Sequence, residues 1–570
     1  MTPSSITAVQ RTDSSGRPRW VSFCDKVGKI EAFSADEVLP AIEKAIEAQN
    51  RGLHAVGWIS YEASPGFDPH LITHSVPTGE PLLRFTLFKT SEDGLPKLEQ
   101  NEALLVPLQP SLSEETFCEK VETIHKAIAR GETYQVNLTY PWTSSFSGCP
   151  RSLFRQIRMT QSGRYQAYLE EEDRIILSAS PERFFRLENG QITCRPMKGT
   201  AKPGDEAILT ESLKDRAENV MIVDMIRNDL GQAATPGSIV TPDLFEIESY
   251  PSLTQMTSTV TAIGPENPLP WLKALFPCAS ITGAPKRNTM KWIHELEETP
   301  RGIYTGCIGG FYADGVTEFN VAIRTLQVTP STGTTTYGTG CGIVWDSDPK
   351  KEYQESILKT AVLNQRYEEV HLLETMRAEP DKGILNLESH LNRLTSSAIQ
   401  LGFEFDLEEI TSKLKASTSQ RSQATRIRLT LSPAGELEIT SAPLPKTFDS
   451  LTFKLDTEPT PSQHPELHHK TTRRTIYEAA RARHPESDET LLINERGECM
   501  EFCIGNLLIE RDDVLMTPAL ECGLLPGVCR AAYVAEGCTE TVITPEDLHT
   551  ADAIYLINAV RGRVPMKQTP

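Results

Sequence analysis

The sequence predicts a large α+β protein with more than one domain. At 570 residues the chain is too long for a single hydrophobic core, and domains of about 150 residues would make three or four units. Hydrophobic residues make up 39% of the chain and charged residues 24%, which is typical of globular proteins. Short strand patterns and longer amphipathic helix patterns both occur along the chain, so we expect a mixture of the two.

The first part, residues 1–110, is expected to form short strands with one or two helices. Apolar residues recur with helical spacing through 36–49, whereas 56–62 have the pattern of a buried strand. Ser113 then supplies a helix N-cap before an amphipathic run that Gly131 would end.

A strand over 133–139 follows, and two later segments, 214–230 and 350–368, have helical patterns whose apolar stripes include Val220 and Leu358. Each helix carries two carboxylates three residues apart, and therefore on one face. These are Asp215 and Glu218 on the first helix, and Glu352 and Glu355 on the second. Two such pairs suit Mg²⁺, which binds few protein oxygens and keeps positions open for a substrate. An acidic pair on a helix is more often only a solvated face, so neither pair identifies a metal site alone.

A lysine in a turn is the strongest candidate for a nucleophile. Lys198 lies between Pro196, which stiffens the backbone, and Gly199, which lets the backbone approach a ligand. A desolvated lysine can lose its proton near neutral pH and attack a substrate. Upstream, Glu182 places a carboxylate just past the apolar strand pattern 174–177. Without a further signal, the lysine is more commonly part of a surface turn.

Three later segments offer groups that bind anions. Lys286 ends a loop, 276–286, that is rich in proline and glycine. Arg324 falls within an apolar strand pattern, where a guanidinium needs a partner and can clamp a carboxylate. Glycines alternate in what we expect to be a loop, whose bare N–H groups can hold a second carboxylate. These glycines are Gly338, Gly340 and Gly342.

Composition excludes several classes of partner. A net charge of −20 argues against nucleic acid, because binding a polyanion needs a basic face. The twelve cysteines include no Cys-x-x-Cys pair, which favours reduced thiols over a zinc site or a disulfide framework. No run of about 18 apolar residues occurs and the N-terminus lacks an apolar signal segment, so we expect a cytoplasmic protein without a membrane partner.

The Ser-Pro-Glu at 180–182 and the Pro-x-x-Gly-Thr at 196–200 place Glu182 sixteen residues before Lys198. This arrangement resembles the signature of the chorismate-utilising enzymes. The resemblance implies a β-sandwich with outer helices, in which 1–110 are the N-terminal part of a synthase component I and 111–368 the chorismate-binding catalytic domain. Members that form 4-amino-4-deoxychorismate carry lysine at position 198, whereas those that form anthranilate or isochorismate carry alanine.

The same resemblance implies roles for the candidate residues. Lys198 would be the nucleophile and Glu182 the general acid, while Tyr304 would line the chorismate pocket. Arg324 and the glycine segment would hold the enolpyruvyl carboxylate, with Lys286 as a further anion ligand. The two carboxylate pairs would hold Mg²⁺ against the ring carboxylate.

A second pattern begins at Val370 and runs to the C-terminus. The motifs at 373–377, 388–394 and 469–474 resemble the class IV pyridoxal-phosphate enzymes, and among them the 4-amino-4-deoxychorismate lyases. The resemblance implies a two-lobed α/β domain over 369–570 that binds pyridoxal 5′-phosphate. Its cofactor residues would be Lys470 for covalent attachment, Glu501 for the ring nitrogen, and Arg393 with the N–H groups of Val528 and Cys529 for the phosphate.

Three positions depart from the patterns of these families. Gln255 stands where the chorismate-utilising enzymes often have histidine, and Ala279 where they have glycine, which leaves the shape of that loop open. Ala559 replaces a serine or threonine hydroxyl expected near the cofactor phosphate, a loss of about 0.5–1.5 kcal/mol.

Together the two resemblances imply successive reactions. Chorismate and ammonia would give 4-amino-4-deoxychorismate, from which the second domain would release pyruvate and 4-aminobenzoate, the folate precursor. No Gly-x-Cys-x-Gly segment of a glutamine amidotransferase occurs, so ammonia would come from a separate subunit or from solution. A homodimer through the lyase domain is a further expectation. The alternatives are an anthranilate-synthase-like half joined to a class IV aminotransferase, and a decayed regulatory subunit.

Overall fold

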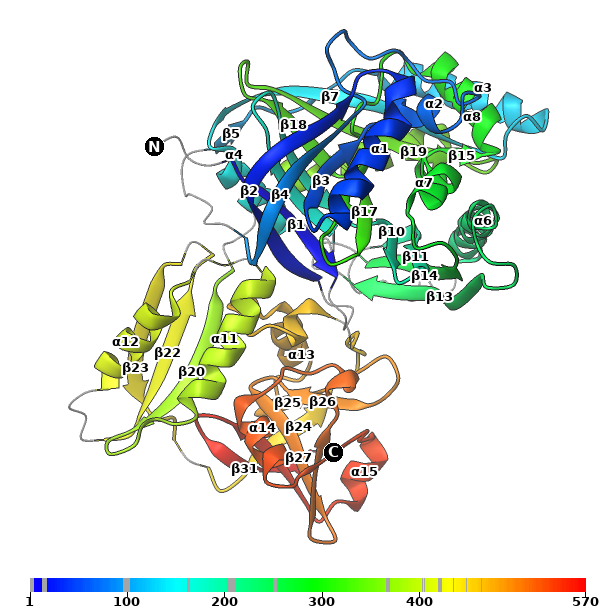
Figure 1. The fold of residues 1–570 in the computed structure, drawn as a ribbon. Helices are drawn as coiled ribbons and strands as arrows, with labels where there is room; N and C mark the ends of the chain where they lie inside the picture. Colours follow the sequence, from blue (N-terminus) through cyan, green and yellow to red (C-terminus); the bar gives the residue numbers. More distant parts are fainter. Residues whose placement is uncertain are drawn as a thin grey trace. The chain divides into compact units, whose positions relative to one another are not determined.

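The structure is a computed structural model of the chain. It describes residues 5–12, 18–95, 103–160, 165–201, 209, 212–249, 254–364, 370–401, 403, 405–418, 423–433, 435–446, 448–462 and 464–569. The chain divides into two compact units, which Figure 1 draws in blue to green and in yellow to red. Unit 1 comprises Met1–Glu248 and Ser252–Tyr367, and unit 2 comprises Ser249–Pro251 and Glu368–Pro570.

Unit 1 is built on one long antiparallel sheet. Its strands are β1 (Thr7–Thr12), β2 (Pro18–Ala32), β3 (His54–Ile59), β4 (Leu83–Asp93), β5 (Ala103–Leu105), β6 (Gln109–Pro110), β7 (Gln135–Gly148), β8 (Tyr165–Glu170), β9 (Ile175–Ser180), β10 (Arg183–Glu188), β11 (Gln191–Arg195), β12 (Met197–Ala201), β13 (Val240–Ser249), β14 (Thr254–Ile263), β15 (Gly283–Ala284), β16 (Cys307–Phe311), β17 (Thr317–Val321), β18 (Thr325–Thr329) and β19 (Thr334–Ile343). Paired neighbours run β14-β11-β10-β17-β16-β3-β4-β2-β1-β8-β9-β18-β19-β7. Strands from before and after residue 110 therefore share one sheet.

Helices cover the outer faces of this sheet. They are α1 (Ala35–Asn50), α2 (Ser64–Phe67), α3 (Glu114–Ala129), α4 (Pro150–Thr160), α6 (Leu213–Leu230), α7 (Leu269–Leu275), α8 (Lys286–Leu296), α9 (Pro349–Leu358) and α10 (Ala361–Asn364), with 3₁₀ turns η1 (Tyr61–Ala63) and η2 (Ala279–Ile281). One buried cluster packs α1, α6 and α7 against strands, and a second does so for α3, α4, α8 and α9. A third cluster, around Phe23 and Trp58, contains no helix residue and lies between strands. This is the predicted β-sandwich with outer helices.

The predicted elements of unit 1 are present with shifted ends. The expected helix 36–49 is α1, and the helix after Ser113 is α3, whose Thr116 N–H donates to the Ser113 hydroxyl at 3.2 Å. The stripe assigned to 214–230 is wrong at Val220, which is 40% exposed. The helix expected over 350–368 ends at Leu358, which is 71% exposed, and α10 follows as a separate turn.

A buried ion pair fastens the segment that follows α8. The Nε and Nη2 atoms of Arg301 donate to Glu297 at 2.8 and 2.6 Å. Arg301 also donates to the carbonyl of Asn137 at 2.7 Å, in β7, and to that of Ile281 at 3.1 Å, in η2. Glu297 in turn accepts from the backbone N–H of Thr139 at 2.9 Å. One pair thus joins β7, η2 and the chain leading into β16.

Replacing Glu297 by glutamine should destabilise unit 1 by about 3–5 kcal/mol, because the change strands a buried guanidinium without its counterion. Urea unfolding followed by circular dichroism measures the loss. The control is Glu298→Gln, one residue along, because Glu298 is 77% exposed and 3.3 Å from Lys120; its loss should stay under about 1 kcal/mol. Equal urea midpoints for the two variants would show that the pair does not hold the unit together.

Unit 2 has two sheets, as expected for a two-lobed α/β domain. The first contains β20 (Leu372–Glu379), β21 (Gly383–Ile384), β22 (Thr425–Leu431) and β23 (Leu437–Pro443). The second contains β24 (Leu451–Leu455), β25 (Glu489–Ile493), β26 (Cys499–Phe502), β27 (Gly505–Arg511), β28 (Val514–Pro518), β29 (Thr539–Thr541), β30 (Ala553–Asn558) and β31 (Gly562–Gln568). Strands β24, β25, β26, β27, β30 and β31 pair in a closed ring.

The helices of unit 2 pack on these two sheets. They are α11 (Leu387–Leu401), α12 (Leu407–Thr418), α13 (Thr475–Arg483), α14 (Val528–Ala535) and α15 (Pro545–Thr550), with 3₁₀ turns η3 (Pro465–Leu467) and η4 (Leu520–Cys522). Apolar residues of α11 and α12 cover one face of β20 and β22, as Figure 1 also shows. Within the described ranges, no helix of either unit has the length and apolar character needed to cross a membrane.

Candidate active sites

Glu182 lies in the short link between β9 and β10, and only 3% of it is exposed. The hydroxyl of Ser280, in η2, donates to its Oε1 at 2.7 Å. Burial raises the pKa of Glu182 to about 7, although the Ser280 hydrogen bond and the positive charge of Lys198 act in the other direction. A carboxyl group with this pKa can donate a proton at neutral pH.

Lys198 is held in β12, which pairs with β14 through an irregular register between Met197 and Thr200. Gly199 within the irregularity has φ +87°. The ammonium of Lys198 lies 3.9 Å from Oε2 of Glu218, and its side chain is 16% exposed. A Cβ on Gly342 would lie 2.9 Å from this ammonium, so the lysine side chain reaches β19 closely at a residue that has no side chain of its own.

The alternating glycines lie in a strand, not in the loop expected from the sequence. They belong to β19, where Gly338 is opposite Pro141, Gly340 opposite Thr139 and Gly342 opposite Asn137. Pairing with β18 stops at Tyr337, so the edge of β19 that faces away from β7 has no strand partner beyond that point among the described residues. Backbone N–H groups on such an edge remain available to a ligand. A Cβ at Gly338 would also lie 2.2 Å from the Tyr304 ring.

Arg324 was expected inside a strand, but it lies in the link between β17 and β18 with φ +51°. Its carbonyl accepts from the N–H of Ala179 at 3.0 Å, and its charge acts on Tyr337 at the start of the glycine segment. A left-handed backbone at a non-glycine residue is uncommon and occurs often at functional sites.

Lys286, at the start of α8, is engaged by protein groups. Its ammonium donates to Oδ2 of Asp229 at 3.1 Å and to the carbonyls of Leu275 at 3.1 Å and Ala274 at 3.4 Å. Three bonds use all three donors of an ammonium. Lys286 therefore ties α8 to the ends of α6 and α7, and its role as an anion ligand stays a prediction.

The predicted metal ligands form two groups. Carboxylate oxygens of Glu352 and Glu355, on α9, lie within 4.8 Å of one another and of the Cys341 sulfur. Glu355 also accepts from Lys359 at 2.9 Å. Glu218, on α6, is the carboxylate beside Lys198, whereas the side chain of Asp215 falls outside the described part of the chain. Carboxylate oxygens at this spacing fit a hard cation such as Mg²⁺.

Two buried glutamine side chains lie near the site. No role was predicted for the first from the sequence, and the second was noted only as a departure from the family pattern. Gln135, in β7, is fully buried with no partner for its amide nitrogen or oxygen among the described residues, and its Nε2 would lie 3.0 Å from a Cβ on Gly342. Gln255, in β14, is equally buried and equally lacks partners within the described ranges. An unsatisfied buried amide costs about 1–3 kcal/mol and commonly marks a place where water or a ligand binds.

Ser280 is the other residue whose role the sequence did not reveal, although it lies in the loop that was singled out. Ala279 beside it is 3% exposed and begins η2 without a positive φ, so glycine is not required there. A strand with a polar residue at a buried position is the signal that could have identified Gln135; nothing in the loop sequence distinguishes Ser280 from its neighbours.

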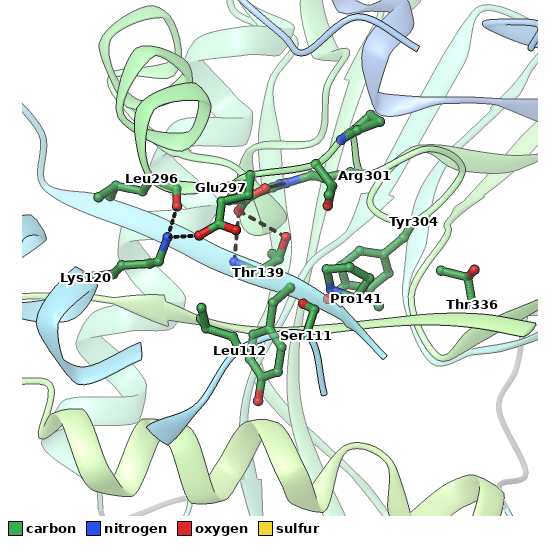
Figure 2. A pocket seen from close by; sticks show the side chains of 15 residues that line it. Ser111, Leu112, Lys120, Thr139, Pro141, Leu296, Glu297, Arg301, Tyr304 and Thr336 are labelled. Atoms are coloured by element: carbon green, nitrogen blue, oxygen red, sulfur yellow. Dashed lines mark hydrogen bonds and ion pairs between the residues drawn. The ribbon is translucent and has the colours of Figure 1, made fainter. Parts of the chain in front are cut away.

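A pocket of about 80 Å³ adjoins the glycine segment and is drawn in Figure 2. Tyr304 and Gly338 line it together with the ion pair of Glu297 and Arg301. Lys198 and Glu182 are not among its lining residues. The predicted substrate residue Tyr304 therefore contacts this pocket, while the candidate nucleophile lies in β12 and the candidate acid in the link between β9 and β10.

In unit 2, Lys470 lies between η3 and α13 and pairs with the start of β20. Its carbonyl accepts from the N–H of Leu373 at 2.9 Å, and Thr471 forms a bridge with Leu372. Burial and the nearby charge of Arg393 lower the pKa of Lys470 to about 8. A lysine of this kind can act as a base or a nucleophile near neutral pH.

Glu501, which was predicted to bind the ring nitrogen of the cofactor, is a buried carboxylate in β26. It accepts from the Tyr477 hydroxyl at 2.7 Å, the Leu525 N–H at 3.0 Å and the Asn506 amide at 3.0 Å. Burial raises the pKa of Glu501 to about 7, with Lys470 among the charges that oppose the rise. Arg474, which stacks on the Tyr477 ring at 4.4 Å, was not identified from the sequence.

Arg393, in α11, reaches the start of α14. Its Nη1 donates to the Pro526 carbonyl at 3.1 Å, while Nε and Nη2 are held by Glu374 at 2.8 and 2.7 Å. Burial would raise the pKa of Glu374, but Arg393 and His390 lower it to about 2. Val528 and Cys529 are the first residues of α14, whose N–H groups have no intrahelical partner.

These residues of unit 2 fit pyridoxal phosphate. A lysine with a lowered pKa, a buried carboxylate and an arginine beside a helix start are the groups that such a cofactor needs. Ala559 lies in the turn after β30, where the N–H groups of Val560 and Arg561 donate to Asn558.

Comparisons with known proteins agree with this division. Residues 11–365 match the family model of chorismate binding enzymes, and residues 371–569 match that of amino-transferase class IV. Aminodeoxychorismate synthase component 1 of Klebsiella aerogenes is 40% identical over 259 residues, which cover 44% of this chain and 57% of that protein. The chain thus spans little more than half the length of that relative.

Two solved structures resemble parts of the chain. Anthranilate synthase component I from Streptococcus pneumoniae is 22% identical with a TM-score of 0.50, covering 64% of this chain and 93% of that one, which shows the fold of unit 1. A putative amino-acid aminotransferase from Mesorhizobium loti is 37% identical with a TM-score of 0.34, covering 35% of this chain and all of that one.

The class IV match implies pyridoxal phosphate as the cofactor of unit 2. Because the first family model covers well over half of the 570 residues, and unit 1 has the corresponding fold, the chain belongs to the family of chorismate binding enzymes, with a class IV amino-transferase domain behind it.

Proposed function

We propose that the chain makes 4-aminobenzoate from chorismate in two successive reactions. Unit 1 would convert chorismate and ammonia into 4-amino-4-deoxychorismate, and unit 2 would release pyruvate from that product. The proposal rests on the position of Lys198. Its ammonium lies close to Gly342 of β19, and its positive charge acts on the buried carboxyl group of Glu182. A nucleophile and an acid in this relation suit a ring substitution, and the relatives of unit 1 are named for this synthase reaction.

In unit 1, Lys198 would add through Nζ to C2 of chorismate while Glu182 delivers a proton to the C4 hydroxyl, which leaves as water. Ammonia would then add at C4, and the lysine would leave from C2 with its electron pair. Burial keeps Glu182 protonated near neutral pH, which this step requires. Arg324 and the free edge of β19 would hold the enolpyruvyl carboxylate, and Tyr304 would pack beside the ring.

Asp215, Glu218, Glu352 and Glu355 would hold Mg²⁺, which would neutralise the ring carboxylate of the substrate. The support is the approach of Glu352 and Glu355 to each other at the end of the glycine strand. In the structure, Lys359 forms an ion pair with Glu355, and Lys198 forms one with Glu218.

In unit 2, Lys470 would hold the cofactor and then move a proton from C4 of the aminodeoxychorismate ring. Glu501 would bind the ring nitrogen of the cofactor, and Arg393 with the N–H groups of Val528 and Cys529 would bind its phosphate. Pyridoxal phosphate supplies an electron sink for the charge left at C4. Tyr477 and Asn506 orient Glu501 by their hydrogen bonds.

A separate glutamine amidotransferase would supply ammonia, since the relatives of unit 1 are named as component 1 of a synthase.

All twelve cysteines are free, which suits a reducing cytoplasm. A homodimer through unit 2 is part of the proposal.

The proposed function is tested by mixing the protein with chorismate, Mg²⁺, pyridoxal phosphate and ammonium, and separating the aromatic products. We expect 4-aminobenzoate with an equal amount of pyruvate. Lys198→Ala should stop the first reaction yet still convert added 4-amino-4-deoxychorismate. Lys470→Ala should do the reverse and accumulate that intermediate. Anthranilate as the product, or a Lys198→Ala variant that forms aminodeoxychorismate at the full rate, would refute the assignment of unit 1.

The first reaction should slow as pH rises through about 7, because Glu182 has to be protonated to act as an acid and its raised pKa lies there. Ser280→Ala removes a hydrogen bond that lowers this pKa, so the falling limb should move to higher pH by up to about one unit. The pH dependence of kcat/KM for chorismate measures both. A limb that Ser280→Ala leaves in place would mean that another group titrates.

A further inference from the structure

A second pocket, of about 300 Å³, lies on the first sheet of unit 2. It is lined by His371, Arg428, Thr430, Glu438, Thr440 and Thr472. Arg428 and Thr430 come from β22, and Glu438 and Thr440 from β23, where they are directly opposite each other in the strand register. None of these residues has a role in the chemistry described above. The pocket is therefore a polar surface whose purpose is unassigned.

Strand register places Lys470 on the same face as this pocket. Thr471 is opposite Leu372, so its neighbours Lys470 and Thr472 are opposite Leu373 and His371. Leu373 is in turn opposite Thr430. Residues opposite each other in a ladder share a face, and residues two apart along a strand do as well. Lys470, Thr430 and Arg428 thus belong to one face, while Ile427 and Leu429 face the helices on the other.

The distance between Lys470 and the pocket is comparable to the length of a small molecule. Two strand spacings separate the backbones of Lys470 and Thr430, which is roughly 10 Å. Arg428 lies two residues along β22 from Thr430, and a long arginine side chain can cover part of that distance. A small molecule with one end at Lys470 can therefore reach Arg428 with its other end.

Arg428 has a charge that protein groups leave unbalanced. Its side chain makes no hydrogen bond or ion pair with any other described residue, and Glu438 in the same pocket is not paired with it. Arg393, by contrast, is held through two nitrogens by Glu374. A guanidinium with free donors beside two threonine hydroxyls is a site for a carboxylate, which it can bind through two parallel hydrogen bonds.

We propose that Arg428, with Thr430 and Thr440, binds the ring carboxylate of the substrate of unit 2. This inference rests on the proposed function, and it names the feature by which unit 2 selects its substrate. The ring holds this carboxylate opposite the amine, so it can reach Arg428 while the amine stays at Lys470. An α-amino acid carries its carboxylate on the carbon next to the amine, and its carboxylate stays at the Lys470 end.

The test compares two probes that differ only in charge, 4-aminobenzoate and 4-aminobenzamide, added to the full chain loaded with pyridoxal phosphate. The absorbance of the cofactor reports binding at unit 2 alone. We expect Arg428→Gln to weaken binding of the acid about 10- to 100-fold and to leave the amide unchanged. Arg428→Lys should recover part of the loss, since it keeps the charge without the fork.

The matched control is Arg426→Gln. Arg426 is also exposed, lies on the same strand and face two residues from Arg428, and does not line the pocket. It should change neither probe. With 4-amino-4-deoxychorismate as substrate, Arg428→Gln should raise KM by the same factor and change kcat little, because the carboxylate is bound in both ground and transition states.

Two outcomes would overturn the inference. Equal losses for acid and amide would mean that Arg428 only supports the fold, and an Arg428-dependent response to pyruvate but not to 4-aminobenzoate would assign the pocket to the other carboxylate. Failure of the proposed function looks different: the unaltered protein would then release no 4-aminobenzoate from 4-amino-4-deoxychorismate, whatever residue stands at 428.

Discussion

The buried pair of Arg301 and Glu297 is the constraint on which the first candidate site depends. Its hydrogen bonds reach β7, η2 and the segment that carries Tyr304. Those three elements contribute Gln135, Ser280 and Tyr304, and Ser280 in turn holds Glu182. The short strand β15, which follows η2, pairs with β7, and the charged pair adds the connection from these elements to the segment that carries Tyr304. Removing both charges together would affect the positions of the site residues as well as the stability of the unit, because Arg301 and Glu297 hold different segments in place.

Burial prepares two glutamates in the same way for different tasks. Glu182 and Glu501 are both 3% exposed, both accept hydrogen bonds from neighbouring side chains, and the pKa of each rises to about 7. Each also lies close enough to a lysine to feel its charge. Glu182 would give up its proton to a leaving hydroxyl, whereas Glu501 would stay paired with a protonated ring nitrogen. Environment sets the proton affinity, and the neighbouring ligand decides its use.

Much of the fold, and the local surroundings of some candidate site residues, could be predicted from the sequence, because short-range patterns determine them. Ser113 caps α3 as expected, and Gly199 beside Lys198 has a positive φ, although Lys198 lies in strand β12 and not in the turn expected from the sequence. The stripe of α6 could not be phased, because Val220, Met221, Ile222 and Val223 are all apolar and only packing buries the last two.

The remaining differences are those that tertiary structure decides. Arg324 reads as strand in sequence, but β17 and β18 end on either side of it and leave a left-handed link. The glycines of 338–342 have the composition of a loop, yet pairing with β7 makes them a strand. The sequence also could not show that Asp229, 57 positions earlier, accepts a hydrogen bond from Lys286. Sequence spacing holds no information about such contacts.

The closed ring of six strands in unit 2 also affects how the protein behaves in solution. Closure leaves little exposed edge, and the strand that ends the extension, β29, has only three residues, with Glu540 bound to Arg530. Exposed edges are the templates on which chains add to one another as intermolecular sheets, and short or charged edges prevent it. The ring therefore protects the second sheet of unit 2 from aggregation at high concentration, a property set by topology and independent of what the unit catalyses.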